Sequence, residues 1–355
     1  MVSRKRDKRA SGRVTLDDVA LAAGVSRMTV SRALRGDRKV APELVERAIE
    51  AADRLGYVPD PAARALASSK SSHVAILIPL LSNQLFVDLL EGVQRTLLPA
   101  GYQTLMGITH YDASEEEQLL RGYLMHRPAG LLVTGVERSD STRQLIAKSG
   151  IPCVHLMETL AQQGTYSVGF SQRDAAHAIT QHLIDTGRRR IAFAAAQLDP
   201  RTLQRAQGYR DCLRAAGLYD ATLEWQNPAP SSLKVGSAMF EQILSIRPRV
   251  DAIFFCNDDL AQGGLLAALR MGIKVPRQVC VAGFNDLPGS AEFVPSLTTI
   301  KTPRWEIGVR AAQMLLQLMR GEPVAEPNVD LGFELLVRQS TAVAGAVNRR
   351  SDLPG

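Results

Sequence analysis

Residues 74–284 contain seven short apolar runs, each separated from the next by a stretch long enough to form an amphipathic helix. The runs are VAILIP (74–79), QTLMGI (103–108), GLLVTG (130–135), IPCVHL (151–156), RIAFAAA (190–196), DAIFFC (251–256) and QVCVAGF (278–284). Continuous apolar strands that alternate with helices are typical of parallel sheets covered on both faces. The pattern extends over residues 73–342, more than one doubly wound unit needs, so it predicts an α/β body of two lobes.

Positive charge is concentrated in the first fifth of the chain. Residues 1–70 contain 15 Lys and Arg against 9 Asp and Glu, a net charge of +6, whereas residues 71–355 contain 27 of each sign. A basic module joined to a neutral body indicates a polyanionic partner. Charge alone leaves DNA, RNA and an anionic membrane surface open as that partner.

Residues 14–58 have the sequence pattern of three short helices. Thr15 begins a capping box, Gly24 ends the first helix, Ser26 is a natural N-cap for the second, and Pro42 opens the third. Two helices joined by a short turn that contains glycine form a helix-turn-helix, in which the start of the second helix faces the base edges of DNA. This pattern favours DNA as the partner. The competing interpretation is a trihelical bundle that binds no nucleic acid.

Two longer strings carry a family resemblance. VTLDDVALAAGVSRMTVSRALRG (14–36) and RLGYVPDPAARALA (54–67) resemble the headpiece and hinge of the lactose/galactose repressor family, bacterial transcription regulators with a periplasmic-binding-protein-like core. The likeness extends from residue 14 to about residue 342. Within the family, the chain most resembles the gluconate-operon repressors. The strings that carry this finer likeness are GYQTL (101–105), LDPRTLQRAQGY (198–209), CNDDLAQG (256–263) and VDLGFEL (329–335).

The resemblance implies a division of the chain into five segments. We expect a disordered basic arm (1–13), a helix-turn-helix DNA-binding domain (14–58), a hinge helix with linker (59–72), a two-lobed effector-binding and dimerisation core (73–342) and a flexible tail (343–355). The hinge helix would lie in AARALA (62–67) and would form only when two hinges meet on DNA.

The resemblance also implies which residues contact DNA. Arg27 and Met28 occupy the base-reading positions of the second helix, and the arginine fork suits guanine O6 and N7. The positions that contact the DNA backbone and base edges hold Thr15, Ser26, Thr29, Ser31 and Arg32. In the hinge, Ala63 and Leu66 match residues that enter the minor groove, where the leucine acts as a wedge between base steps.

The α/β body has no sequence signature of an enzyme. There is no G-x-G-x-x-G, P-loop or H-E-x-x-H, and GFSQR (169–173) has Arg173 where a nucleophile elbow needs glycine. The six histidines show no metal-ligand spacing. We therefore expect neither catalysis nor a cofactor nor a metal, and instead a ligand cleft at the carboxyl ends of the strands.

Polar and aromatic residues at these strand ends match the family's effector-contact positions. They are Ser82, Asn83, Phe86, Thr134, Glu158, Arg201, Arg205, Asn257 and Asn285. We expect the two arginines to lie in one loop, where they suit a carboxylate, and the neutral Asn285 stands where many relatives carry aspartate. These features favour an acyclic sugar acid: gluconate, or the related 2-ketogluconate or 6-phosphogluconate. A neutral sugar remains the alternative.

The expected mechanism is that of a homodimer on a pseudo-palindromic operator, released when a sugar acid closes the lobes and unpairs the hinges. Two alternatives stay open: a ligand that acts as corepressor or a protein that activates, and a sugar-modifying enzyme fused to a DNA-binding module. The longest apolar run, at 74–81, is too short to span a bilayer, and the N-terminus lacks a secretory signal. We therefore expect a cytoplasmic protein, associated with the nucleoid when bound to DNA, without a membrane partner.

Overall fold

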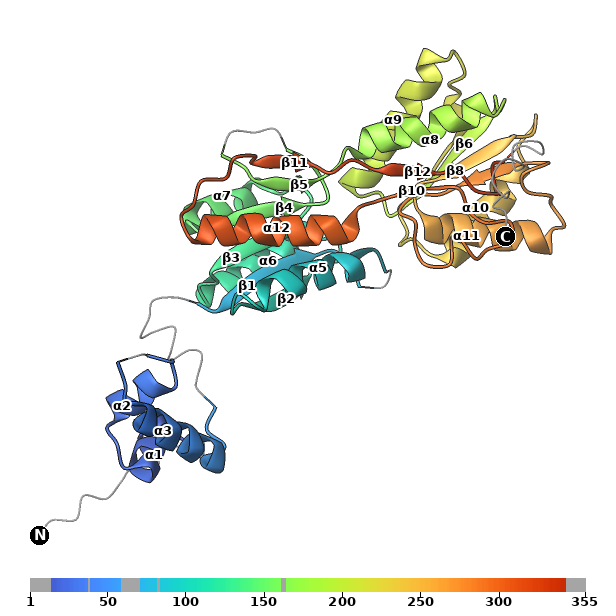
Figure 1. Cartoon of the computed structure of the whole chain (residues 1–355). Coiled ribbons are helices and arrows are strands. Elements are labelled where there is room, and N and C mark those ends of the chain that lie inside the picture. The colour runs from blue at the N-terminus through green and yellow to red at the C-terminus, as the bar shows by residue number, and fades with distance from the viewer. Residues whose placement is uncertain (1–13, 38, 59–70, 82–83, 161–163, 343–355) are drawn as a thin grey trace, which may run out of the picture. The chain divides into compact units, whose positions relative to one another are not determined.

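The computed structural model describes residues 14–37, 39–58, 71–81, 84–160 and 164–342 (Figure 1). The chain forms two compact units, which divide between Ser71 and Ser72. The predicted arm and tail lie outside the described residues, and so does the hinge except for its last two residues.

The first unit is a bundle of three helices, α1 (Leu16–Ala23), α2 (Arg27–Ala33) and α3 (Pro42–Leu55). Thr15 caps α1 in a reciprocal capping box with Asp18, and Gly24 ends the helix at φ +63°, a conformation that glycine adopts without strain. The small core contains Val19, Val30 and Ala48, each fully buried. The predicted helix-turn-helix is thus confirmed.

The second unit begins with a lobe built on a six-stranded sheet of order β11-β5-β4-β3-β1-β2, in which every neighbouring pair is parallel. Its strands are β1 (His73–Ile78), β2 (Gln103–Ile108), β3 (Gly130–Thr134), β4 (Cys153–Leu156), β5 (Ser167–Gly169) and β11 (Asn328–Asp330). Its helices are η1 (Gln84–Phe86), α5 (Val87–Leu97), α6 (Ala113–Met125), α7 (Asp140–Ser149) and α12 (Arg304–Met319).

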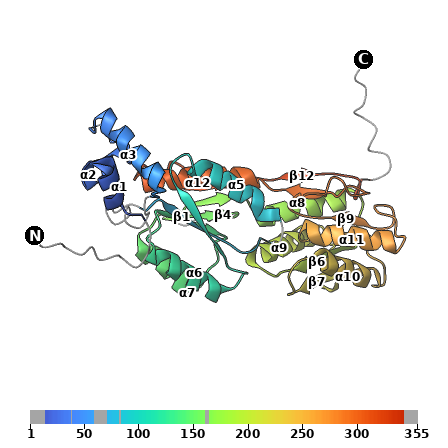
Figure 2. The same ribbon diagram turned by 90° about the horizontal axis from the view of Figure 1, so that it is seen from below.

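Alternate residues of β1 pack into two different cores. Val74 and Ile76 belong to the core that includes α5 and α12, whereas Ala75 and Leu77 belong to the core under α6 and α7. Figure 2 shows these helix pairs on opposite sides of the sheet. Burial on both faces explains why the strand reads as a continuous apolar run.

The second lobe has a four-stranded parallel sheet of order β7-β6-β8-β9. Its strands are β6 (Ile191–Ala196), β7 (Glu224–Asn227), β8 (Ala252–Phe255) and β9 (Cys280–Ala282). Its helices are α8 (Gln172–Asp185), α9 (Pro200–Ala215), η2 (Ala221–Leu223), α10 (Leu233–Leu244) and α11 (Asp258–Arg270). Phe193 lies 5.2 Å, between ring centroids, from both Tyr209 and Phe254 at the centre of this lobe.

The chain passes between the two lobes three times. It enters the second lobe after β5, returns between β10 (Thr299–Lys301) and α12, and leaves again between β11 and β12 (Glu334–Leu336), where β10 and β12 pair antiparallel (Figure 1). Helix α12 and strand β11 therefore complete the first lobe from late in the sequence. The predicted two-lobed α/β core is confirmed. Within the described ranges, no helix is long and apolar enough to cross a membrane.

Candidate functional site

The start of α2 is organised by the two hydroxyl groups predicted to contact DNA. The Ser26 Oγ accepts a hydrogen bond from the Thr29 amide at 3.0 Å and shares a second with the Thr29 hydroxyl at 2.8 Å. Ser26 remains solvent-exposed, whereas Thr29 is half-buried. Ser26 is therefore the N-cap that the sequence predicts, and its oxygen still faces solvent.

The predicted base-reading residues are exposed. The side chains of Arg27 and Met28 are each about two-thirds accessible. A guanidinium nitrogen of Arg27 lies 3.6 Å from the carboxylate of Asp17 on α1, a neighbour that the sequence does not reveal. Arg32 lies 3.7 Å from Asp37, and Thr15 is engaged in its capping box. Ser31 lies on α2 and is half-buried, while Ala63 and Leu66 lie outside the described residues.

Arg201 is the polar centre of the second unit's candidate site. Its side chain is only 6% exposed, its Nε lies 3.2 Å from the Asp199 carboxylate, and its Nη2 donates to the Tyr111 hydroxyl at 3.0 Å. The guanidinium lies 5.7 Å from the Phe86 ring centroid and 5.6 Å from that of Tyr111. Among the described residues, nothing accepts a hydrogen bond from the buried Nη1.

Arg205 is also buried, but its hydrogen bonds are made within the second lobe. Its Nε donates to the Gln172 side chain at 2.9 Å, and its Nη1 donates to the main-chain carbonyl of Cys256 at 2.6 Å. The guanidinium lies 3.9 Å from the Phe284 ring centroid. The expectation that both arginines lie in a loop is wrong, because both project from α9. A single helix fixes their spacing more firmly than a loop does.

Glu158 is a second point at which the lobes meet. Its carboxylate accepts from the Gln204 side chain of α9 at 2.7 Å and from the main-chain amide of Val136 at 3.3 Å. Burial raises the pKa of Glu158, and the nearby Arg201 charge opposes that shift. Thr134 lies close by in sequence, but its hydroxyl donates to the Leu77 carbonyl at 3.0 Å, within the first lobe.

The two predicted asparagines follow neighbouring strands of the second lobe. Asn257 caps α11, accepting from the Leu260 amide at 3.3 Å and the Ser231 hydroxyl at 3.1 Å. Asn285 is 2% exposed, has φ +105°, and its side-chain oxygen has no partner in the described part of the chain. An unpartnered buried acceptor beside a strained backbone is a typical feature of a ligand-binding position.

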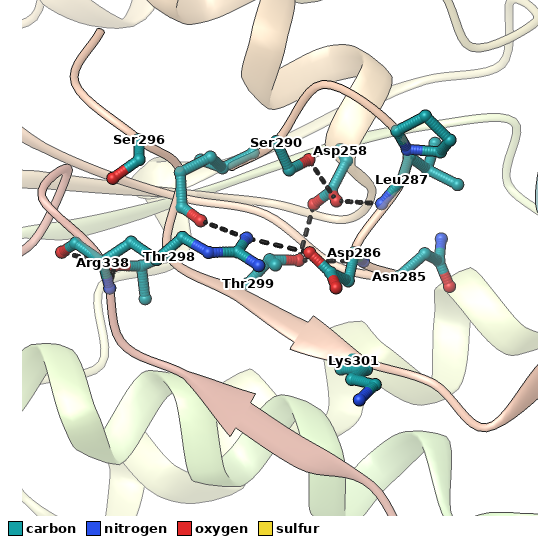
Figure 3. A network of polar contacts seen from close by, with 12 residues as sticks. Asp258, Asn285, Asp286, Leu287, Ser290, Ser296, Thr298, Thr299, Lys301 and Arg338 are labelled. Carbon is teal, nitrogen blue, oxygen red and sulfur yellow. Dashed lines mark hydrogen bonds and ion pairs between the residues drawn. The ribbon is translucent and has the colours of Figure 1, made fainter. Parts of the chain in front are cut away.

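A buried carboxylate holds the loop that carries Asn285. Asp258, fully buried, accepts from the Leu287 amide at 2.7 Å and from the Ser290 and Thr299 hydroxyls at 2.8 and 2.7 Å (Figure 3). Burial raises the pKa of Asp258 to about 6, although all three hydrogen bonds oppose the shift. This network fixes the loop from the side of the protein core.

Ion pairs support the same loop from outside. Asp286, with φ +50°, lies 2.8 Å from Arg338 (Figure 3). Arg304, at the start of α12, donates to the main-chain carbonyl of Asn285 and lies 2.9 Å from Asp88 on α5. The loop is thus linked to both lobes.

The structure brings most of the predicted ligand residues into one connected region. Arg201 contacts Phe86, and Arg205 interacts electrostatically with Arg201 and Asp199. Ser82 and Asn83 lie outside the described residues. Four further residues of this region are absent from the prediction: Tyr111, Gln172, Asp199 and Gln204. Tyr111 was detectable, because it follows β2 just as the predicted residues follow their strands.

The chain resembles known proteins over nearly its whole length. Residues 15–60 match the family described as "Bacterial regulatory proteins, lacI family", and residues 180–341 match a "Periplasmic binding protein-like domain". The HTH-type transcriptional regulator GntR of Pseudomonas aeruginosa is 53% identical, over 95% of this chain and 99% of that protein. The regulator IdnR of Escherichia coli is 34% identical, over 91% and 97%.

Solved structures give the same result. The crystal structure of transcription regulator GntR from Chromobacterium violaceum is 48% identical, with a TM-score of 0.74, over 76% of this chain and 99% of that one. A LacI family transcriptional regulator from Silicibacter pomeroyi is 34% identical, with a TM-score of 0.86, over 92% and 99%.

Proposed function

The chain belongs to the LacI family of bacterial regulatory proteins, and on that premise we propose that it represses genes for sugar-acid uptake and catabolism until the acid binds. The acid we favour is gluconate, with 2-ketogluconate and 6-phosphogluconate as close alternatives. Binding between the two lobes weakens operator binding and so relieves repression. The ligand is not consumed.

The family itself confirms the broader predictions from sequence. Its members are DNA-binding transcription regulators rather than enzymes, and they bind operator DNA as dimers that respond to small effectors. The resemblance to gluconate-operon repressors agrees with the printed names of two relatives, GntR and IdnR. The identity of the effector is our proposal.

The unpartnered Nη1 of Arg201 is the observation that carries the choice of an acid. A buried donor without a partner costs about 1–3 kcal/mol, and a carboxylate oxygen would remove that cost through a charge-assisted bond. The unpartnered oxygen of Asn285 is an acceptor, which suits a sugar hydroxyl. Phe86 supplies an apolar wall beside the arginine.

The remaining ligand residues have more limited roles in this proposal. Arg205 would position the cleft wall and offer its remaining guanidinium edge, and Glu158 and Asn257 would accept or donate to hydroxyl groups. Thr134 would contribute at most its hydroxyl oxygen as an acceptor, because its hydrogen is used by Leu77. Ser82 and Asn83, which lie outside the described residues, stay predicted ligand contacts.

For DNA we propose that Arg27 and Met28 read bases in the major groove. The residues that would contact the DNA backbone and base edges are Thr15, Ser26, Thr29, Ser31 and Arg32. Ala63 and Leu66 would enter the minor groove. In a test of this assignment, Leu66→Ala should weaken specific operator binding more than non-specific binding. An equal loss of both would contradict a minor-groove wedge.

We propose that two copies associate through exposed apolar side chains on both lobes. Leu269 on α11 is 74% exposed and Leu98, directly after α5, is 57% exposed. Contact with a second copy would remove both side chains from water, which favours association. Sedimentation equilibrium tests this: wild type should be a dimer and a Leu269→Asp variant should be shifted toward monomer.

A neutral sugar is the second candidate ligand. The structure titled "transcriptional regulator CelR-cellobiose complex" is 29% identical over 92% of this chain, with a TM-score of 0.68. Calorimetry with gluconate, 2-ketogluconate, 6-phosphogluconate, glucose and cellobiose separates the classes. Tight binding of an acid supports our proposal, whereas binding of a neutral sugar alone overturns the choice of ligand and leaves the regulator intact.

A further inference from the structure

Arg201 is held by two of its three guanidinium nitrogens, and the third has no hydrogen-bond partner among the described residues. The Nε is occupied by Asp199, the Nη2 by Tyr111, and the Nη1 is the buried nitrogen left over. Because the group is planar, these bonds also fix the direction in which Nη1 points. The first lobe thus contributes directly to orienting an arginine of the second lobe.

Tyr111 reaches this position through an uncommon turn. It follows β2, and both His110 and Tyr111 have positive φ, +47° and +60°, which non-glycine residues rarely adopt. The His110 amide donates to the Pro79 carbonyl at 3.0 Å, and its ring lies 2.7 Å from Glu115. The turn is therefore tied to the first lobe on both sides, and it delivers the phenol to Arg201.

The phenol of Tyr111 has a hydrogen to donate. Its oxygen acts as the acceptor for Arg201, so that bond does not use the hydrogen of the hydroxyl group. Burial raises the pKa of Tyr111 to about 12, and the group stays protonated at neutral pH. The same guanidinium thus brings together two possible donors, one from each lobe: the Tyr111 hydroxyl, which is bonded to Nη2, and the Arg201 Nη1 itself.

The charges around these donors select the kind of anion they can hold. Asp199 lies 3.2 Å from Arg201, and the buried Glu158 also interacts electrostatically with the guanidinium. A phosphate ester carries close to two negative charges and three acceptor oxygens, so it would be repelled by both acids and would leave acceptors unpaired. A monocarboxylate carries one negative charge and two acceptor oxygens, so the two acids repel it less than a phosphate and each of its oxygens can accept from one of the two donors.

We infer that Tyr111 and Arg201 together bind the carboxylate of the effector, so that the acid group itself connects the first lobe to the second. This inference rests on the proposed sugar-acid function and adds the residue that makes lobe closure depend on the acid. A neutral sugar could occupy the same space, but it would form weaker bonds with both donors, since hydrogen bonds to an ionised group are roughly twice as strong.

Isothermal calorimetry on the full chain tests the inference with gluconate and its neutral amide, gluconamide. Tyr111→Phe should lower gluconate affinity about tenfold or more and gluconamide affinity much less. Arg201→Lys, which keeps the charge but loses the guanidinium fork, should shift the same ratio in the same direction. The matched control is Tyr219→Phe, which removes a phenol hydrogen bond to Glu224 elsewhere in the second lobe and should leave both affinities unchanged.

Each result has a distinct meaning. If the wild-type protein binds gluconate and Tyr111→Phe binds it equally well, the inference is wrong and the proposed function stands. If Tyr111→Phe loses affinity for gluconate and gluconamide by the same factor, the tyrosine only closes the lobes and does not bind the acid. If the wild-type protein binds neither gluconate nor a related acid, the proposed function fails before this inference is reached. Thermal unfolding of each variant confirms that it is folded.

Discussion

Arg304 connects the ligand loop to the first lobe through Asp88: its guanidinium lies 2.9 Å from the Asp88 carboxylate and also donates to the carbonyl of Asn285. Helices α5 and α12 pack closely beside this contact. A Cβ atom at Gly308 would lie 2.2 Å from the Leu89 carbonyl oxygen, so the close approach requires glycine at this position. A displacement of the Asn285 backbone would therefore be transmitted through Arg304 and Asp88 to helices α5 and α12 of the first lobe.

We expect Asp88→Asn to weaken the coupling between ligand and operator. The substitution removes the charge that pairs with the mostly buried Arg304, so the coupling free energy between ligand and operator should fall by about 1 kcal/mol. The factor by which gluconate changes operator affinity should therefore be roughly fivefold smaller than in wild type. The measurement is operator affinity with and without saturating gluconate. Glu91→Gln is the matched control, since Glu91 lies on the same helix and pairs only with the exposed Arg95. If gluconate changes operator affinity by the same factor in wild type, Asp88→Asn and Glu91→Gln, the contact between Asp88 and Arg304 does not transmit the effect of the ligand.

Arg201→Ala and Arg205→Ala should both weaken gluconate binding while leaving operator affinity intact, and both should destabilise the second unit, the first because it leaves the buried Asp199 carboxylate without its arginine. Arg205→Ala leaves the Gln172 side chain and the Cys256 carbonyl without their donor, a cost of about 2 kcal/mol or more. Denaturant unfolding followed by tryptophan fluorescence reports this unit selectively, because both tryptophans, Trp225 and Trp305, lie in it. Wild-type stability of Arg205→Ala would contradict the structural role assigned to its bonds with Gln172 and Cys256.

Substitutions of Ser26 separate its capping role from DNA contact. Ser26→Ala removes the N-cap of α2 and should cost about 1 kcal/mol of local stability, measured by hydrogen exchange of the α2 amides. Ser26→Asp retains a capping oxygen but places a negative charge on the same exposed surface. We expect the Asp variant to keep α2 protected and yet bind operator less tightly than the Ala variant. Operator binding by Ser26→Asp at wild-type strength would show that Ser26 does not face a phosphate.

The buried Asp258 should make the second unit more stable as the pH falls. Its pKa is raised to about 6, so the folded protein binds this proton at a pH where the unfolded chain does not. Between pH 4 and 6, stability from this group is lost as pH rises, by at most about 1.4 kcal/mol per pH unit. Relative to Asp258→Asn, wild type should gain about 2 kcal/mol between pH 7.5 and 4.5. A relative loss of stability at low pH would mean that the carboxylate is stabilised in its ionised form.

Local features of the fold were readable from the sequence, and contacts between distant segments were not. The capping box at Thr15, the N-cap at Ser26 and the turn at Gly24 depend only on near neighbours, so their residue types reveal them. The return of α12 and β11 to the first lobe depends on pairing between strands far apart in sequence, such as β11 with β5, and no local pattern encodes it.

The candidate site shows the same limit. The strand-end rule identified Arg201 and Glu158, because loops at the carboxyl ends of parallel strands meet at one edge. It could not distinguish Arg201 from Arg205, since only packing shows that Arg205 is bound to Gln172 and Cys256 while Arg201 keeps a free nitrogen. Tyr111, which follows β2, satisfies the same rule, but only the structure shows that its hydroxyl accepts a hydrogen bond from Arg201 of the other lobe.

The central claim is that a sugar acid controls whether this protein stays on its operator. The direct test is fluorescence anisotropy of a labelled palindromic DNA site, selected by the protein from a random pool and titrated at fixed salt with and without saturating gluconate. We expect gluconate to weaken binding at least tenfold, which corresponds to about 1.4 kcal/mol of coupling. Unchanged or tighter binding with gluconate, while calorimetry shows that it is bound, would contradict the claim.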